Sequence, residues 1–389
     1  MPMAVWDELT GQSEAIAIFA AAASASAAGG SGNSSMTHSW LITGPPGSGR
    51  SNLAFAFATA LLSTSPEGDE SVRAQVAART HPDLAVLSTD RVIISIDEVR
   101  KLVSTSQYSP SVGRYRVVII EDADRMTERT SNVLLKALEE PPPRTVWILC
   151  APSEADLIPT IRSRVRTVQL RVPAIEDVAQ LIHRRDGVSL DLATSAAREA
   201  QSHIGMAHRL ATNADARQRR ARTLELALGI RSVSGAVLAA ATLLQLATDD
   251  AKAITEERDA EERESALRSL GVEPGGTIPA ALRAQLKTLE DDQKRRATRS
   301  LRDGIDRILV DLLSLYRDVL LLQLGVGGEL INLSIERQLQ DAAASSTSPQ
   351  TLATMDAIAS ARTRIAGNVT PALALEAMLV TAIRTGKAA

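Results

Sequence analysis

Trp40-Leu-Ile-Thr-Gly-Pro-Pro-Gly-Ser-Gly-Arg-Ser-Asn52 is the stretch that decides the fold of this chain. The apolar run from Trp40 to Ile42 predicts a buried strand, and the residues from Asn52 to Leu62 have the apolar pattern of a helix. A strand, a glycine-rich turn and a helix in this order form the context of a phosphate-binding loop, or P-loop. Its glycines let backbone N–H groups surround an anion, and the N-terminus of the helix adds positive partial charge. The sequence therefore predicts a P-loop α/β domain.

The candidate nucleotide-binding residues lie in this loop and at the start of the helix. Gly44 and Gly49 have the spacing of the motif G-x-x-x-x-G-K-[S/T], and Ser51 takes the place of the hydroxyl that holds Mg²⁺. Arg50 stands where the motif requires lysine; it keeps the charge but is bulkier and holds its donors in a rigid fork. We therefore expect the fold to persist without ATP turnover, with ATP binding left open and Mg²⁺ only beside a bound nucleotide. The full candidate set is Gly44, Pro45, Pro46, Gly47, Ser48, Gly49, Arg50, Ser51 and Asn52.

The composition is that of an ordinary globular protein of two or three domains. The chain has 389 residues, of which 44% are hydrophobic and 23% charged. Its single cysteine, Cys150, excludes an internal disulfide and a Cys-cluster zinc site. A net charge of −3 argues against binding nucleic acid by bulk charge alone. The N-terminus lacks a basic signal region and no apolar run is long enough to span a membrane, so we expect a cytoplasmic protein without membrane contact.

Apolar runs alternate with helical patterns over residues 1–170, which predicts a parallel sheet with its sites at the carboxyl ends of the strands. Three short helices are expected within residues 171–215, at residues 175–185, 190–201 and 206–213, as a small second domain. Long helices follow over residues 216–389 and predict an all-α domain. The strands are expected at residues 40–42, 84–87, 116–120, 146–150 and 166–170.

Two acids, Glu121 and Asp122, follow the third predicted strand, where a P-loop ATPase places an Asp for Mg²⁺ and a Glu for the attacking water. Here the order is reversed, so the longer Glu121 stands in the metal position and the shorter Asp122 in the base position. A working metal pair and two solvated acids that cap a helix are both open interpretations. A polar sensor residue would fall near Ala151, which has no hydroxyl.

Four motifs occur together in this order: Gly44-Pro-Pro-Gly-Ser-Gly-Arg-Ser51, His81-Pro-Asp-Leu84, Asn132-Val-Leu-Leu-Lys-Ala-Leu-Glu-Glu-Pro-Pro142 and Thr160-Ile-Arg-Ser-Arg-Val165. With them, residues 5 to about 213 resemble the AAA+ subunits of the bacterial sliding-clamp loader, whereas the C-terminal half is similar only as a helical domain. The resemblance implies that residues 171–215 are a lid domain and residues 216–389 an oligomerisation domain of the collar type. The degenerate loop, the reversed acids and Ala151 resemble the non-motor subunit of that complex. The resemblance implies a structural subunit of the DNA polymerase III holoenzyme, in whose chain no polymerase chemistry resides.

The resemblance also implies a role for Arg164, which matches the arginine of the family's Ser-Arg-Cys motif. Such an arginine reaches the ATP of a neighbouring subunit, where its guanidinium stabilises charge on the transferring phosphate. The alternative is that Arg164 pairs with a local acid. The implied partners are the γ/τ motor subunits and the δ subunit, with the sliding clamp and primer–template DNA reached through the complex. His208 and Arg209 both remain candidates for the family's second sensor, and the family's zinc cysteines are missing, so no zinc is expected.

Two other functions compete with this interpretation. One is an active motor ATPase of the same complex, against which Arg50, the reversed acids and Ala151 argue. The other is an unrelated P-loop kinase, which the helical C-terminal region and the stretch from Leu134 to Pro142 oppose.

Overall fold

The computed structural model describes residues 5–6, 9–27, 36–65, 68–89, 93–269 and 283–383. The chain forms two compact units, residues 1–212 and 213–389. The division of the first unit at residue 170 into an α/β domain and a lid stays a prediction.

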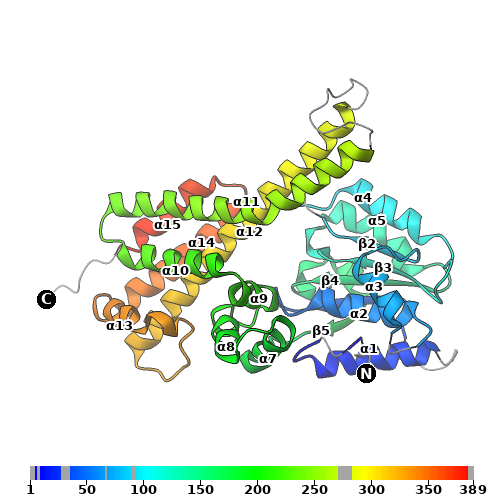
Figure 1. Ribbon diagram of the computed structural model, residues 1–389, viewed down its shortest axis with the longest axis horizontal. Coiled ribbons are helices and arrows are strands. Elements are labelled where there is room, and N and C mark those ends of the chain that lie inside the picture. Colours follow the sequence, from blue (N-terminus) through cyan, green and yellow to red (C-terminus); the bar gives the residue numbers. More distant parts are fainter. Residues whose placement is uncertain are drawn as a thin grey trace. The chain divides into compact units, whose positions relative to one another are not determined.

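A five-stranded parallel sheet organises the first unit, with the strand order β2-β3-β4-β1-β5 (Figure 1). This confirms the predicted α/β class. β1 lies between β4 and β5, so the loop after it opens where the chain crosses the sheet, which is the usual place of a ligand site in such folds. The strands are β1 Ser39–Thr43, β2 Leu84–Leu87, β3 Arg116–Ile120, β4 Thr145–Ala151 and β5 Arg166–Gln169.

Helices cover both faces of the sheet because alternate strand residues point to opposite faces. Ile42 and Ile148 pack with α1, α2 and α3, whereas Leu41 and Leu149 pack with α4, α5 and α6. All four side chains are fully buried, which explains why these strands are continuous apolar runs in the sequence. The helices are α1 Ser13–Ala27, α2 Arg50–Leu62, α3 Glu70–Ala77, α4 Ile96–Ser106, α5 Glu128–Glu139 and α6 Pro159–Arg162, with short 3₁₀ turns η1 Ala123–Arg125 and η2 Glu154–Asp156.

The chain's single cysteine, Cys150, lies at the centre of this core on β4 and is fully buried. Burial raises the pKa of its thiol to about 12, so the reactive thiolate is scarce at neutral pH. We expect a thiol reagent to leave the native chain unlabelled and to label one group per chain after denaturation. Fast labelling of the native chain would contradict this packing of β4.

Asp83, in the His81-Pro-Asp-Leu motif, anchors the loop that precedes β3. Its fully buried carboxylate accepts backbone N–H bonds from Ser111, Val112 and Gly113, each 2.7 Å long, and a hydroxyl bond of 2.9 Å from Ser111. It also pairs with Arg116 at 3.2 Å. The motif therefore has a structural explanation: one buried carboxylate accepts the N–H groups of three consecutive loop residues and holds that loop in place.

Three helices complete the first unit: α7 Ile175–Asp186, α8 Leu190–Glu199 and α9 Ile204–Thr212. Between α8 and α9, Gln201 and Ser202 both have positive φ, 50° and 62°, which lets the chain reverse within a few residues. α9 begins earlier than the predicted Met206, because His203 Nδ1 accepts the backbone N–H of Met206 at 3.2 Å and caps the helix.

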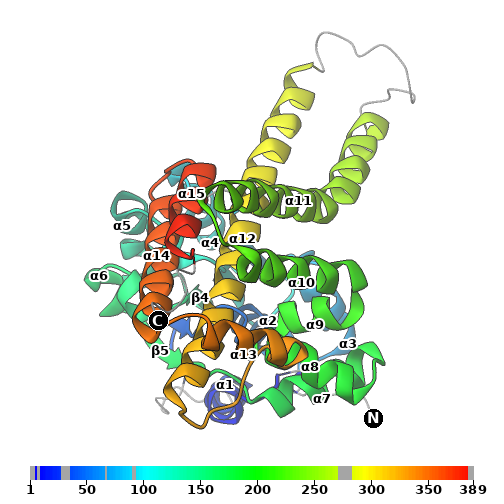
Figure 2. The same cartoon turned by 90° about the vertical axis from the view of Figure 1, so that its left-hand side faces the viewer.

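The second unit is entirely helical in its described part, as predicted. α11 and α12 pack against each other, and their distal halves project as a hairpin (Figure 2). The charged stretches of this hairpin form ion pairs between its helices as well as solvated faces: Arg296 Nη1 bonds to Asp259 Oδ1 at 2.6 Å. The helices are α10 Ala214–Gly229, α11 Val233–Ser269, α12 Arg283–Leu324, α13 Glu336–Ala344, α14 Ser348–Ala366 and α15 Pro371–Thr381, with the 3₁₀ turn η4 Leu333–Ile335.

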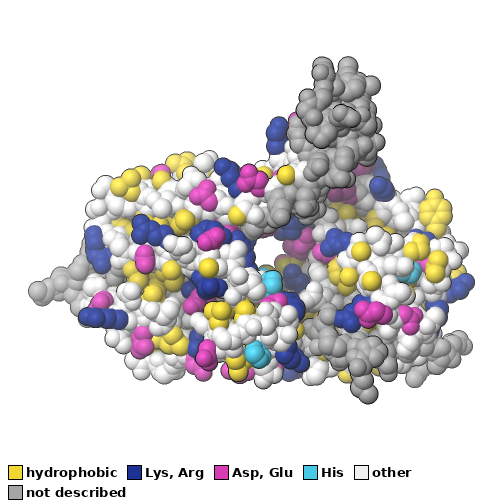
Figure 3. Space-filling model, viewed as in Figure 1, with side chains coloured by type: hydrophobic (Ala, Val, Ile, Leu, Met, Phe, Trp, Pro, Cys, Tyr) yellow, Lys and Arg dark blue, Asp and Glu magenta, His cyan; other side chains and the backbone are white. Residues whose placement is uncertain are grey.

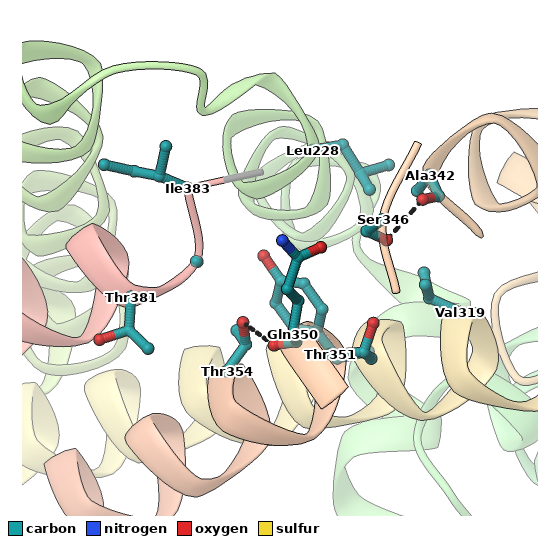
Figure 4. Close-up of a pocket in the computed structure, with 11 residues that line it drawn as sticks. Leu228, Val319, Ala342, Ser346, Gln350, Thr351, Thr354, Thr381 and Ile383 are labelled. Atoms are coloured by element: carbon teal, nitrogen blue, oxygen red, sulfur yellow. Dashed lines mark hydrogen bonds between the residues drawn. The ribbon is translucent and has the colours of Figure 1, made fainter. Parts of the chain in front are cut away.

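A small hollow in this unit lies between α12, α13, α14 and the end of α15 (Figure 4). Its hydroxyls are engaged with backbone: Ser346 donates to the carbonyl of Ala342 at 2.7 Å, and Thr354 donates to that of Gln350 at 3.0 Å. It offers about 20 Å³, room for little more than one water molecule. The hollow is therefore too small for a nucleotide. Of the helices that the structure describes, none is long and apolar enough to cross a membrane.

Candidate P-loop and arginine site

The predicted P-loop links β1 to α2, and its glycines occupy conformations that other residues rarely adopt. Gly44, Gly47 and Gly49 have φ of 155°, 79° and 93°. A Cβ at Gly44 would lie 2.8 Å from the hydroxyl of Ser48, so the loop can close this tightly only with glycine there. Ser48 N–H bonds to the carbonyl of Pro45 at 3.2 Å and completes the turn.

Gln12, in the turn before α1, is hydrogen-bonded to the P-loop. This contact was not predicted from the sequence. Its side chain is 6% exposed, and its Nε2 donates to the carbonyls of Arg171 at 2.8 Å and Ser48 at 3.4 Å. Its Oε1 accepts the backbone N–H of Arg171 at 3.2 Å. A single amide therefore ties the loop to the chain segment that leaves the sheet.

Arg50, the first residue of α2, turns back onto its own loop: its Nη1 donates to the carbonyl of Gly44. The buried Ser48 hydroxyl makes no hydrogen bond to any of the described residues. Ser51 is half-buried, whereas Pro46 and Asn52 are exposed. The guanidinium that replaces the motif's lysine is thus bound by the backbone that should surround a phosphate.

The start of α9 contacts the same loop at Gly47. The carbonyl of Gly47 accepts the backbone N–H of Ile204 at 3.2 Å, and a Cβ at Gly47 would overlap the imidazole ring of His203. The start of α9 therefore lies directly on the loop. His208, one of the two sensor candidates, pairs instead with Asp186 of α7 at 2.7 Å.

The two acids after β3 lie near the loop but are already engaged. Glu121 Oε1 accepts a 2.6 Å bond from Arg79, and its side chain is only 14% exposed. Asp122 precedes η1 and makes no side-chain cap there, so neither acid is the solvated helix cap considered from the sequence. Asp124, which follows them, is partly buried, and this burial raises its pKa.

Ala151 lies at the end of β4, where the sequence predicted the polar sensor position of an ATPase. Ala151 ends β4 and pairs with Thr43, the last residue of β1, so it lies beside the loop without a hydroxyl to offer. Within the ranges that the structure describes, no three His, Cys, Asp or Glu side chains gather so that they could hold a metal ion.

These residues depart from the usual P-loop ATPase site in several contacts. The backbone has the form of an anion-binding loop, yet Arg50 and the start of α9 bond to the carbonyls of Gly44 and Gly47, and Glu121 is bound to Arg79. Whether residues 44–52, Glu121 and Asp122 bind ATP, with Mg²⁺ only beside a bound nucleotide, stays open, and the expected absence of zinc stays a prediction.

Arg164 lies at the opposite edge of the sheet. Arg166 begins β5 and pairs with Trp40, near the start of β1, whereas the P-loop follows the end of β1 at Thr43. With a rise of about 3.3 Å per residue, the length of β1 separates the two positions. Because Arg164 precedes β5, its guanidinium lies far from the P-loop of its own chain.

Arg164 does pair with a local acid, as the alternative interpretation held. Its Nε donates to Glu139 Oε1 at 2.6 Å, and its Nη1 donates to the carbonyl of Thr160 at 2.7 Å and the hydroxyl of Ser163 at 3.0 Å. The side chain is still 33% exposed, so this pairing leaves the guanidinium accessible from outside the chain.

His203, Gln12 and Glu139 were the functional residues that sequence reasoning missed. Glu139 lies inside the Asn132–Pro142 motif. The motif was therefore recognised from the sequence, but no role was assigned to this side chain. His203 and Gln12 carry no local signal, since their contacts with the loop join residues far apart in the sequence.

Comparison with known proteins finds a family model that matches part of the first unit. Residues 26–174 match the family model described as DNA polymerase III, delta subunit. The chain is 36% identical over 140 residues to the DNA polymerase III subunit delta′ of Pseudomonas aeruginosa, covering 34% of this chain and 43% of that protein. It is 30% identical over 177 residues to the delta′ subunit of Escherichia coli, covering 44% of this chain and 53% of that protein.

A DNA polymerase III subunit gamma/tau, from Mycobacterium tuberculosis, is 28% identical over 165 residues, covering 40% of this chain and 28% of that protein. The chain thus spans about half the length of the delta′ relatives that it matches. Through residues 26–174, which contain the P-loop, this chain is similar to the DNA polymerase III subunit delta′.

Proposed function

We propose that this chain is a structural subunit of the clamp loader of DNA polymerase III and does not hydrolyse ATP itself. Its partners are the γ/τ motor subunits and the δ subunit, which together load the sliding clamp onto primed DNA in the cytoplasm. Arg164 serves the ATP site of a neighbouring motor subunit, and the helical unit joins the chain to the others.

The observation that carries this proposal is the position of Arg164. The strand register places it at the edge of the sheet opposite its own P-loop, with the guanidinium accessible. An arginine there cannot act on a nucleotide bound in the same chain, yet it is available to one bound by a neighbour. A guanidinium offered in trans stabilises the charge that develops on a transferring phosphoryl group.

The state of the chain's own site supports the other half of the proposal. Arg50 is bound to Gly44, His203 covers Gly47, and Ala151 lacks a sensor hydroxyl. Basic and acidic side chains are interspersed over the face shown in Figure 3, which fits a net charge of −3 and a protein that meets DNA through its complex.

Nucleotide binding by the purified chain tests this half directly. We expect no hydrolysis and no saturable binding of a fluorescent ATP analogue over about 1 μM–1 mM, the range of ordinary KM values. Arg50→Lys alone should change little, because His203 and Ile204 still contact Gly47. The double variant Arg50→Lys/His203→Ala removes both obstacles and should bind measurably.

The matched control for the double variant is Arg50→Lys/His183→Ala, because His183 lies on α7 and its ring bonds to the carbonyl of Val188 at 2.7 Å rather than to the loop. This control variant should bind the fluorescent ATP analogue no better than the wild type does. Tight binding and turnover by the wild-type chain would instead favour a motor ATPase of the same complex.

A further inference from the structure

The guanidinium of Arg164 is held in one orientation by three neighbours. Glu139 accepts its Nε–H at 2.6 Å and also contacts Nη2, while the carbonyl of Thr160 and the hydroxyl of Ser163 accept from Nη1. Ser163 in turn donates to the same Thr160 carbonyl at 3.1 Å. Thr160 and Ser163 belong to Arg164's own turn, so Glu139 is the contact that ties the arginine to another element.

Glu139 is itself fixed by the helix that carries it. It is the last residue of α5, because Pro141 and Pro142 follow and a helix cannot continue through them. The neighbouring Leu138 and Leu134 are fully buried against the sheet. The carboxylate is thus presented from a rigid position, although 45% of its own side chain is exposed.

On the basis of the proposed role of Arg164, we infer that Glu139 is a positioning residue for it. Arginine has a large rotamer entropy, and a flexible finger would have to be ordered at each engagement with the neighbouring nucleotide. Glu139 anchors the Nε side of the guanidinium and fixes its plane before the neighbour arrives. In this inference, the Leu-Glu-Glu-Pro-Pro motif supplies the carboxylate that orients the arginine of the Ser-Arg motif.

The test uses ATP hydrolysis by the complex reconstituted with motor and δ subunits. Glu139→Ala should lower the kcat of the site that Arg164 serves by roughly tenfold, since misplacing a catalytic group by about 1 Å can cost up to 100-fold. KM for ATP should change little, because the arginine acts in the transition state. Glu139→Gln keeps the accepting oxygen and should restore most of the rate.

Glu140→Ala is the matched control, because it removes the same charge one residue away from an exposed position. It should leave both the hydrolysis rate and the thermal unfolding of the chain unchanged. In an Arg164→Ala background, Glu139→Ala should have no further effect on the rate, because the two residues act as one unit.

The outcomes separate this inference from the proposed function. If Arg164→Ala lowers the rate and Glu139→Ala does not, the positioning role is wrong and the role of Arg164 stands. A faster rate in both Glu139→Ala and Glu139→Gln would also overturn the inference, since it would show that the carboxylate restrains the finger by its charge. If Arg164→Ala itself has no effect, the proposed function fails.

Discussion

Replacing Asp83 by alanine is expected to lower the free energy of unfolding of the first unit by about 3–5 kcal/mol, the usual cost of removing one partner of a buried ion pair. The change leaves Arg116, whose side chain is 8% exposed, without its carboxylate. It also leaves the N–H groups of residues 111–113 without their acceptor. Few single substitutions in a small α/β domain should cost more.

Urea unfolding followed by tryptophan fluorescence measures this effect in the correct unit, because the chain's three tryptophans, Trp6, Trp40 and Trp147, all lie in residues 1–212. Asp97→Ala is the control: its side chain is 87% exposed and pairs with Arg100 at 3.5 Å. Such a surface pair contributes about 0–1 kcal/mol. Equal losses in the two variants would contradict the anchoring role of Asp83.

The same carboxylate gives stability a defined dependence on pH. Burial by itself would raise the pKa of Asp83, but the hydrogen bonds from Ser111, Gly113 and Val112 outweigh it and hold that pKa below its ordinary value. A lowered pKa in the folded state means that the stabilisation is present above the unfolded-state pKa, near 3.8, and is lost as pH falls through the folded value. The difference between wild type and Asp83→Ala should therefore shrink in acid.

Replacing Arg164 by alanine is expected to lower ATP hydrolysis at the neighbouring site by roughly tenfold or more, a cautious minimum for an arginine supplied in trans. Single-turnover kinetics of the reconstituted complex would separate the hydrolysis step from nucleotide binding and product release. Arg164→Lys should recover only part of the loss, because an ammonium cannot reproduce the planar fork of the guanidinium.

Arg171→Ala is the matched control for this effect. Its side chain is 81% exposed and pairs with Glu14 at 3.0 Å on the surface of the same unit. We expect normal hydrolysis from a complex that contains it. An equal loss in both arginine variants would indicate a general effect of surface charge on assembly and would contradict a specific role for Arg164.

Most of the sheet could be predicted from the sequence because its three central strands, β1, β3 and β4, are buried on both faces and appear as largely apolar runs. The structure extends the predicted strands 40–42 and 146–150 by one residue at each end. It ends the predicted strand 166–170 one residue earlier and matches the bounds of the other two strands. The start of α9 was predicted too late, since the cap that begins it is a histidine side chain rather than one of the common capping residues.

The P-loop could be predicted from the sequence, including the arginine at position 50 in place of lysine. The contacts that the start of α9 makes with this loop could not. The contact between His203 and Gly47 joins residues that no local pattern relates, and it depends on two consecutive left-handed residues, Gln201 and Ser202, that are not glycine. The partner of Arg164 was foreseen only as an unspecified acid. Its identity, Glu139, required the fold to bring the end of α5 beside α6.

One comparison tests the central claim most directly: ATP hydrolysis by the complex reconstituted with Arg164→Ala and, separately, with Arg50→Ala. If the chain supports a neighbour without using its own site, Arg164→Ala lowers the rate by roughly tenfold or more and Arg50→Ala leaves it near that of the wild type. If instead Arg50→Ala abolishes hydrolysis and Arg164→Ala has no effect, the chain is a motor ATPase and the proposed supporting role is wrong.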